Sequence, residues 1–209
     1  MGMSMRRILG YLGAIMVLAG IAVFAASLIT YLGQGDDSSR GSVIVREVEP
    51  VTPPSPGTLA QRIVIESVGI DAPVRTYGLD GDALPEVPTG EDAADVVAWY
   101  DFSALPGTGS NAVFSGHVTW FGEGVFWNLK KLQPGDTIKL VGEDGWEIVY
   151  AVSDSFVVNP GDPQSVNVMS PTATDVITLI TCDGDYQDTG DPVFGGEYSD
   201  RRIVRADRI

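Results

Sequence analysis

Short stretches of β-branched and aromatic residues alternate with turn residues from about residue 59 to the end of the chain. Seven of these stretches are predicted as strands, at residues 62–68, 95–100, 111–118, 136–141, 146–153, 175–181 and 201–206. The sequence GEDG at 142–145 separates two of them and is typical of a hairpin turn. Helical periodicity nowhere lasts beyond about two turns, and its best stretch is 125–132. We therefore expect a mostly antiparallel β domain, either a sandwich or a closed barrel.

A second pattern, at the N-terminus, is an uncharged run of 25 residues from Ile8 to Leu32. At about 1.5 Å per residue, a helix of this length spans the roughly 30 Å hydrocarbon core of a bilayer. A cleaved signal peptide is the alternative, but its apolar region is usually only about 7–15 residues long. Because Arg6 and Arg7 precede the run, we predict a cytoplasmic N-terminus at 1–7, a single transmembrane anchor at 8–32 and everything after it outside the cell.

The chain after the predicted anchor divides into two parts. Residues 33–58 are rich in Ser, Gly and Pro, as in PVTPPSPG at 50–57, and favour an extended stalk over a packed core. Residues 59–209 have a globular composition and enough length for one core. All 28 acidic residues but only 11 basic ones follow the anchor, a net charge of −17 outside the membrane. This charge argues against nucleic acid and anionic lipid as partners of the domain.

Two uncommon residues each end a predicted strand: His117, the only histidine, and Cys182, the only cysteine. A lone thiol outside the cell is buried and inert, paired between molecules, or kept reduced because it is used. A thiol acts as a nucleophile in its thiolate form, and imidazole suits the proton transfer near neutral pH. A buried structural cysteine and a surface histidine remain the alternative on these residues alone.

Three motifs resemble those of the sortases, membrane-anchored cysteine transpeptidases found mostly in Gram-positive bacteria. TLITC at 178–182 matches their TLxTC signature, SGHV at 115–118 resembles their histidine motif, and RRIVRA at 201–206 resembles their arginine-bearing strand. The order His, Cys, Arg and the separation of 65 positions from His117 to Cys182 are also similar. The stretches VAWYDFSALPGTGSNAVFSGH and LKKLQPGDTI look like class D, E and F members. The resemblance extends over about 61–209.

The resemblance implies a fold and a reaction. The fold is a mostly β, closed eight-stranded sortase-like barrel with short helices, preceded by one N-terminal transmembrane helix. The reaction is cleavage of an LPxTG-like sorting signal between Thr and Gly, with a thioester acyl-enzyme that an amine then resolves. The implied partners are secreted proteins that carry such a signal and an amine acceptor from a cell-wall peptide or a pilin lysine. The implied location is the cell membrane, with the catalytic domain outside.

The family pattern also implies a role for each site residue. Cys182 is the nucleophile, and His117 protonates the leaving amine and deprotonates the incoming one. Arg201 supplies hydrogen-bond donors to the oxyanion and substrate backbone; Arg202, on the opposite face of the strand, is the fallback. Thr181 lines the groove and assists the oxyanion, or only packs in its strand.

The sequence also supports expectations about the connection 183–200, about metals and about alternative functions. The 18-residue connection 183–200 is long beside that of class A sortases, so its substrate contacts cannot be transferred. A calcium site needs several acidic side chains, and the stretch 101–111 before the histidine motif holds one Asp. We therefore predict no calcium dependence, and we expect no metal or other cofactor. A catalytically silent extracellular binding or assembly module and a hydrolysing cysteine peptidase remain the alternative functions.

Overall fold

The computed structural model describes residues 59–81 and 84–209. The predicted cytoplasmic N-terminus, transmembrane anchor and stalk, at 1–7, 8–32 and 33–58, lie outside the described residues. Within the described ranges, no helix has the length and apolar character needed to cross a membrane.

The described part of the chain contains eight strands and three short 3-10 helices. The strands are β1 (Ala60–Ile65), β2 (Ile70–Tyr77), β3 (Val97–Tyr100), β4 (Asn111–Ser115), β5 (Thr137–Gly142), β6 (Glu147–Val158), β7 (Val176–Asp191) and β8 (Gly195–Arg208). The helices are η1 (Glu66–Val68), η2 (Leu129–Lys131) and η3 (Ser165–Met169). The seven predicted strands are all present, and β2 is an eighth that the pattern did not predict. The helical stretch expected at 125–132 is reduced to the single turn η2.

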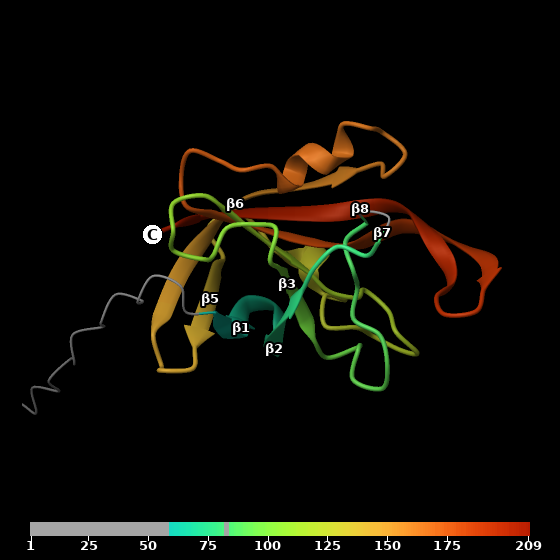
Figure 1. Cartoon of the computed structure of the whole chain (residues 1–209), viewed down its shortest axis with the longest axis horizontal. Coiled ribbons are helices and arrows are strands. Elements are labelled where there is room, and N and C mark those ends of the chain that lie inside the picture. Colours follow the sequence, from blue (N-terminus) through green and yellow to red (C-terminus); the bar gives the residue numbers. More distant parts are fainter. Residues whose placement is uncertain (1–58, 82–83) are drawn as a thin grey trace, which may run out of the picture. The chain divides into compact units, whose positions relative to one another are not determined.

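The strands close into one barrel in the order β1-β2-β3-β4-β7-β8-β6-β5 (Figure 1). The expectation of a closed eight-stranded barrel is therefore confirmed, and the sandwich is excluded. Two neighbouring pairs are parallel, β2 with β3 and β4 with β7, while the remaining pairs are antiparallel. Parallel strands end at the same edge of a sheet. The histidine motif that follows β4 and the cysteine motif on β7 therefore lie at one end of the barrel.

Side chains along β7 alternate between the barrel interior and its outer surface. Ile177 and Leu179 pack in the main core with Val204 and Ala206 of β8. Ile180 faces outward and packs against a second apolar cluster that includes Val113 of β4. Because side chains alternate along a strand, Cys182 shares the outer face with Ile180, whereas Thr181 faces inward.

The buried side-chain amide of Asn111 holds the β6–β7 connection over this outer face. Asn111, which is only 1% exposed, donates through Nδ2 to the carbonyls of Val168 and Ser170, each at 3.0 Å. Its Oδ1 accepts a hydrogen bond from the Thr178 hydroxyl at 2.7 Å. Asn111 thus joins β4, β7 and the segment that contains η3, and it fixes the surface on which Cys182 lies.

Beyond the barrel, β7 and β8 continue as a two-stranded ribbon, the red hairpin that projects from the barrel in Figure 1. The segment 183–200, expected as a connection rich in glycine, is therefore mostly strand. Its register shifts between Asp183 and Tyr186 and again between Asp188 and Asp191. Gly184 and Gly190 adopt φ of 84° and 68° at these irregularities, a conformation that glycine adopts without steric cost.

We predict that Asn111→Ala destabilises the domain by about 1–3 kcal/mol, because the buried hydroxyl of Thr178 loses its acceptor and the Ser170 carbonyl loses its donor, while the Val168 carbonyl keeps a hydrogen bond from Arg205. Urea unfolding of the full-length protein, followed by tryptophan fluorescence, measures this change. Asn167→Ala, at an exposed position of η3, is the matched control and should change stability by less than about 0.5 kcal/mol. Equal stabilities of the two variants would contradict the role assigned to Asn111.

Candidate active site

Cys182 lies on β7 at the end of the barrel, where its side chain is partly buried. It is the free cysteine of the chain. In the antiparallel register of β7 and β8, Cys182 is directly opposite Arg201. Directly opposite residues place their side chains on the same face of a sheet. The thiol and the Arg201 side chain therefore share the outer face of the barrel.

Hydrogen bonds to its own strand hold the Arg201 guanidinium in place. Nη1 donates to the carbonyl oxygens of Tyr198 at 3.0 Å and Asp200 at 2.9 Å. Nη2 lies 3.5 Å from Oε1 of Glu197. A guanidinium carries five N–H donors, so these three contacts leave donors available for a further acceptor beside Cys182.

Arg202 occupies the opposite face. It is opposite Thr181 in the β7–β8 register, and its guanidinium forms an ion pair with Asp183 at 2.6 Å. Of the two adjacent arginines, the structure thus places Arg201 with the thiol and Arg202 away from it.

Thr181 links the cysteine strand to the histidine segment. Its side chain is 5% exposed, and its hydroxyl donates to the carbonyl of Gly116 at 2.7 Å. With the hydroxyl engaged there, on the face opposite Cys182, the placement favours the packing alternative over an oxyanion contact.

His117 follows β4 directly beside this link. The β4–β7 pairing matches Ser115 with Ile180, and Gly116 N donates to the Ile180 carbonyl at 3.2 Å. Gly116 and Thr181 are therefore neighbours, and His117 and Cys182, the residues that follow them, lie at the same end of the barrel. A Cβ on Gly116 would come within 2.6 Å of Val125, so a glycine is needed before the histidine.

The His117 ring is held between a carbonyl and an indole. Its Nε2 lies 2.7 Å from the carbonyl oxygen of Pro88, in the β2–β3 connection. Its ring centroid is 4.6 Å from that of Trp120, whose own Nε1 donates to the Gly90 carbonyl at 3.0 Å. Because a carbonyl oxygen only accepts, Nε2 carries the proton, and the neutral ring keeps its lone pair on Nδ1.

The environment favours the neutral forms of both side chains. Burial lowers the pKa of His117, and the hydrogen bond to Pro88 offsets this only in part. Burial likewise raises the pKa of the Cys182 thiol; Arg201 acts in the opposite direction, and Glu197 adds to the increase. At neutral pH the resting pair is therefore a thiol and an imidazole rather than a thiolate and an imidazolium.

The loop that follows His117 also contacts the projecting hairpin. The hydroxyls of Thr119 and Tyr198 lie 3.0 Å apart, and the ring centroids of Trp120 and Phe194 lie 6.0 Å apart. Pro88, Trp120 and Glu197 are contacts of the site that the motifs did not indicate. Trp120 lies three residues after the histidine and Glu197 four residues before Arg201, so both are close to a motif in sequence, whereas Pro88 lies in a distant connection.

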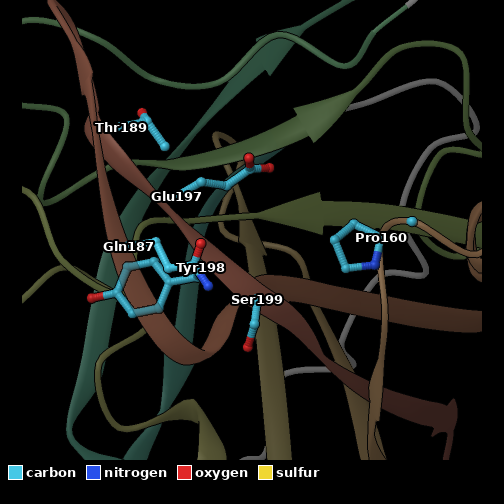
Figure 2. A pocket seen from close by; sticks show the side chains of 7 residues that line it. Pro160, Gln187, Thr189, Glu197, Tyr198 and Ser199 are labelled. Carbon is cyan, nitrogen blue, oxygen red and sulfur yellow. The ribbon is translucent and has the colours of Figure 1, made fainter.

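An open pocket of about 390 Å³ lies between the start of the β6–β7 connection and the β7–β8 hairpin. Figure 2 shows its lining, with Pro160 across from the side chains of the hairpin. The lining residues are Pro160, Gly161, Gln187, Thr189, Glu197, Tyr198 and Ser199. In residues 59–81 and 84–209, no group of three or more His, Cys, Asp or Glu side chains could hold a metal ion.

Comparison with known proteins places this geometry in a family. Residues 63–209 match the sortase domain. The structure resembles the Clostridium perfringens sortase D5 transpeptidase with a TM-score of 0.51 and 25% identity, over 73% of this chain and 79% of the other. It resembles a lid mutant of sortase A from Corynebacterium diphtheriae with a TM-score of 0.54 and 26% identity, over 75% and 72% of the two chains.

The structure also resembles sortase A of Listeria monocytogenes, with a TM-score of 0.51 and 19% identity, over 73% of this chain and 88% of the other. At this low identity, the similarity supports the fold alone. No curated protein sequence matches the chain. The family match covers more than half of the chain and includes the strands that carry His117, Cys182 and Arg201. The chain therefore belongs to the sortase family of cysteine transpeptidases.

Proposed function

We propose that this sortase cleaves an LPxTG-like sorting signal between Thr and Gly, forms a thioester at Cys182 and transfers the acyl group to an amine. The observation that carries the proposal is the meeting of three strand positions at one end of the barrel. Cys182 is opposite Arg201 on a shared face, and His117 follows β4 directly after Gly116, whose carbonyl accepts a hydrogen bond from Thr181 beside the cysteine.

The first half of the reaction begins from the neutral thiol and imidazole. The sulfur attacks the Thr carbonyl carbon while Nδ1 of His117 takes the thiol proton, and Nε2 keeps its own proton, which it donates in a hydrogen bond to the Pro88 carbonyl. The carbonyl oxygen becomes an oxyanion that accepts hydrogen bonds from the free donors of Arg201. When the C–N bond breaks, the imidazolium gives its proton to the departing Gly nitrogen, and a thioester remains.

The second half reverses the roles. An amine attacks the thioester carbonyl, His117 takes the amine proton, and the thiolate leaves and recovers a proton from the imidazolium. A water molecule in place of the amine would give hydrolysis, so the acceptor decides between transfer and peptidase activity. A cell-wall peptide or a pilin lysine is the proposed acceptor.

The cellular setting is part of the proposal and comes from the sequence. The uncharged run at 8–32 would anchor the chain with its N-terminus in the cytoplasm, and the stalk at 33–58 would hold the domain 59–209 outside. Secreted proteins with a C-terminal sorting signal would meet the enzyme there. An unpaired cysteine fits this setting, because a disulfide would consume the nucleophile.

The direct test is incubation of the full-length protein with LPxTG-like peptides and candidate amines, with mass spectrometry of the products. We expect cleavage between Thr and Gly, a protein adduct of the acyl mass, and an amide with the added amine. Cys182→Ala should reduce cleavage to the uncatalysed level because the attacking atom is absent, and His117→Ala should come close to the same loss. Both variants should keep the circular dichroism spectrum of the wild type; wild-type turnover by either would refute the mechanism.

The adjacent arginines provide a matched pair of substitutions. Arg201→Lys keeps the charge but replaces a planar fork with a compact ammonium, so kcat/KM should fall by about 10²-fold or more. Arg202→Lys, beside Asp183 on the other face, should change kcat/KM by only a few-fold. Steady-state kinetics with one peptide measures both, and the reverse order of effects would assign the oxyanion role to Arg202.

The pH dependence of alkylation tests the electrostatics of the thiol. Because burial raises the pKa of Cys182, the rate of reaction with iodoacetamide should rise only at pH values above the usual thiol range. Glu197→Gln removes a negative neighbour and should shift the midpoint to lower pH; Arg201→Gln removes a positive neighbour and should shift it to higher pH. Shifts of the opposite sign would contradict the arrangement described here.

A further inference from the structure

The pocket of Figure 2 lies on the same face of the β7–β8 ribbon as the reacting groups. Gln187 is opposite Glu197 in the register, as Cys182 is opposite Arg201. Glu197 and Arg201 approach each other to 3.5 Å, and Glu197 also influences the pKa of Cys182. The pocket is therefore a continuation of the active-site surface toward the hairpin and the end of β6.

The order of strands indicates which part of a bound peptide reaches this pocket. The strand order β4-β7-β8 places the His117 segment, Cys182 and Arg201 in sequence across the surface, and the pocket continues from there along β7 and β8 into the hairpin. In the proposed reaction the departing Gly nitrogen must face His117, on the β4 side of the thiol. The acyl part of the peptide then extends the other way, over Arg201, whose guanidinium lies 3.5 Å from the Glu197 carboxylate that lines the pocket.

The distance from Arg201 to the pocket along β8 indicates which residue of a bound peptide could reach the pocket. Ser199 and Glu197 lie two and four residues from Arg201, or about 7 and 13 Å at strand spacing. The residue before the scissile Thr lies about 3–4 Å farther along an extended peptide. A long side chain at that position, the variable x of LPxTG, has the reach for Glu197, whereas a short one does not.

The polar and charged groups that line the pocket indicate which kind of substrate side chain it would bind. Gln187, Thr189 and Ser199 bring polar groups to the pocket, and Glu197 is its one formally charged residue. A polar lining does not suit the Leu and Pro of the signal. The Glu197 side chain is 68% exposed and its contact with Arg201 is long, so its carboxylate can turn to meet a second cation.

We propose that this pocket receives the side chain that precedes the scissile Thr, and that Glu197 makes the enzyme prefer a basic residue there. The inference rests on the proposed function, because it takes Cys182 as the attacking atom and His117 as the group facing the departing amine. It adds a specificity-determining residue and a substrate class: sorting signals of the form LP(K/R)TG.

The test compares three peptides, LPKTG, LPQTG and LPETG, in the same preparation of full-length enzyme with a fixed amine. Because an exposed ion pair contributes up to about 1 kcal/mol, or about fivefold, the wild type should process the Lys peptide about 2- to 5-fold faster in kcat/KM than the Glu peptide. The ratio should shrink as ionic strength rises from about 0.05 to 0.5 M, since salt screens exposed charges.

Glu197→Gln should bring the Lys-to-Glu ratio close to one, and Glu197→Lys should invert it. If either substitution moves the Arg201 guanidinium, kcat/KM changes by the same factor for all three peptides, and this factor cancels in the Lys-to-Glu ratio. Glu143→Gln, which removes the same charge from the exposed turn between β5 and β6, is the control and should keep the wild-type ratio.

The outcomes separate the inference from the function on which it rests. Equal processing of the three peptides by the wild type, or a preference that persists in Glu197→Gln, overturns the inference and leaves the proposed function standing. Failure to process any of them, with no acyl adduct at Cys182, overturns both. A preference for Lys that is lost in Glu197→Gln and kept in Glu143→Gln supports the inference.

Discussion

The parallel pairing of β4 with β7 is the constraint on which the rest of the site depends. Two buried polar contacts fix its register: Asn111 with Thr178 at one end and Gly116 with the Thr181 hydroxyl at the other. A one-residue slip in such a pair moves every side chain to the opposite face. The histidine and the cysteine would then no longer lie on the same face, so one hydrogen bond on the outer face and one inside the barrel together determine how the proposed catalytic residues are arranged.

Strand β8, the antiparallel neighbour of β7, completes this arrangement. The β7–β8 register assigns the adjacent arginines to different environments: Arg202 is neutralised by Asp183, while Arg201 is held by main-chain carbonyls next to the thiol. A carbonyl orients a guanidinium without cancelling its charge. Arg201 can therefore attract developing negative charge at the same place where burial keeps the resting thiol neutral.

Much of this architecture could be predicted from the sequence, because strand patterns and short motifs report local structure. The strand β2 was missed because Pro73 interrupts its alternation, and a proline within a run argues against a strand. The hairpin extension was expected as a connection because Gly184, Gly190 and Pro192 are turn residues; in the structure, strand pairing absorbs the two glycines at irregularities in the register.

The partners of the site residues were harder to predict than the residues themselves. The carbonyl of Pro88 has no side-chain signature, and its approach to His117 depends on how a connection 29 residues away folds. Glu197 is one of 28 acidic residues, and nothing local distinguishes it. Long-range packing decides the contact of Pro88, and the contact of Glu197 with Arg201 depends on the extension of β8 into the hairpin. The motifs that carry Cys182 and His117 depend only on the local strand pattern.

The neutral state of Cys182 has a consequence for the durability of the enzyme. Peroxide and disulfides react with thiolates far faster than with thiols, and an overoxidised sulfur is lost irreversibly. A nucleophile kept protonated by burial is therefore a poor target for oxidants until a substrate arrives. In an oxidising environment, the burial that disfavours the thiolate would therefore also protect the sulfur of the proposed nucleophile.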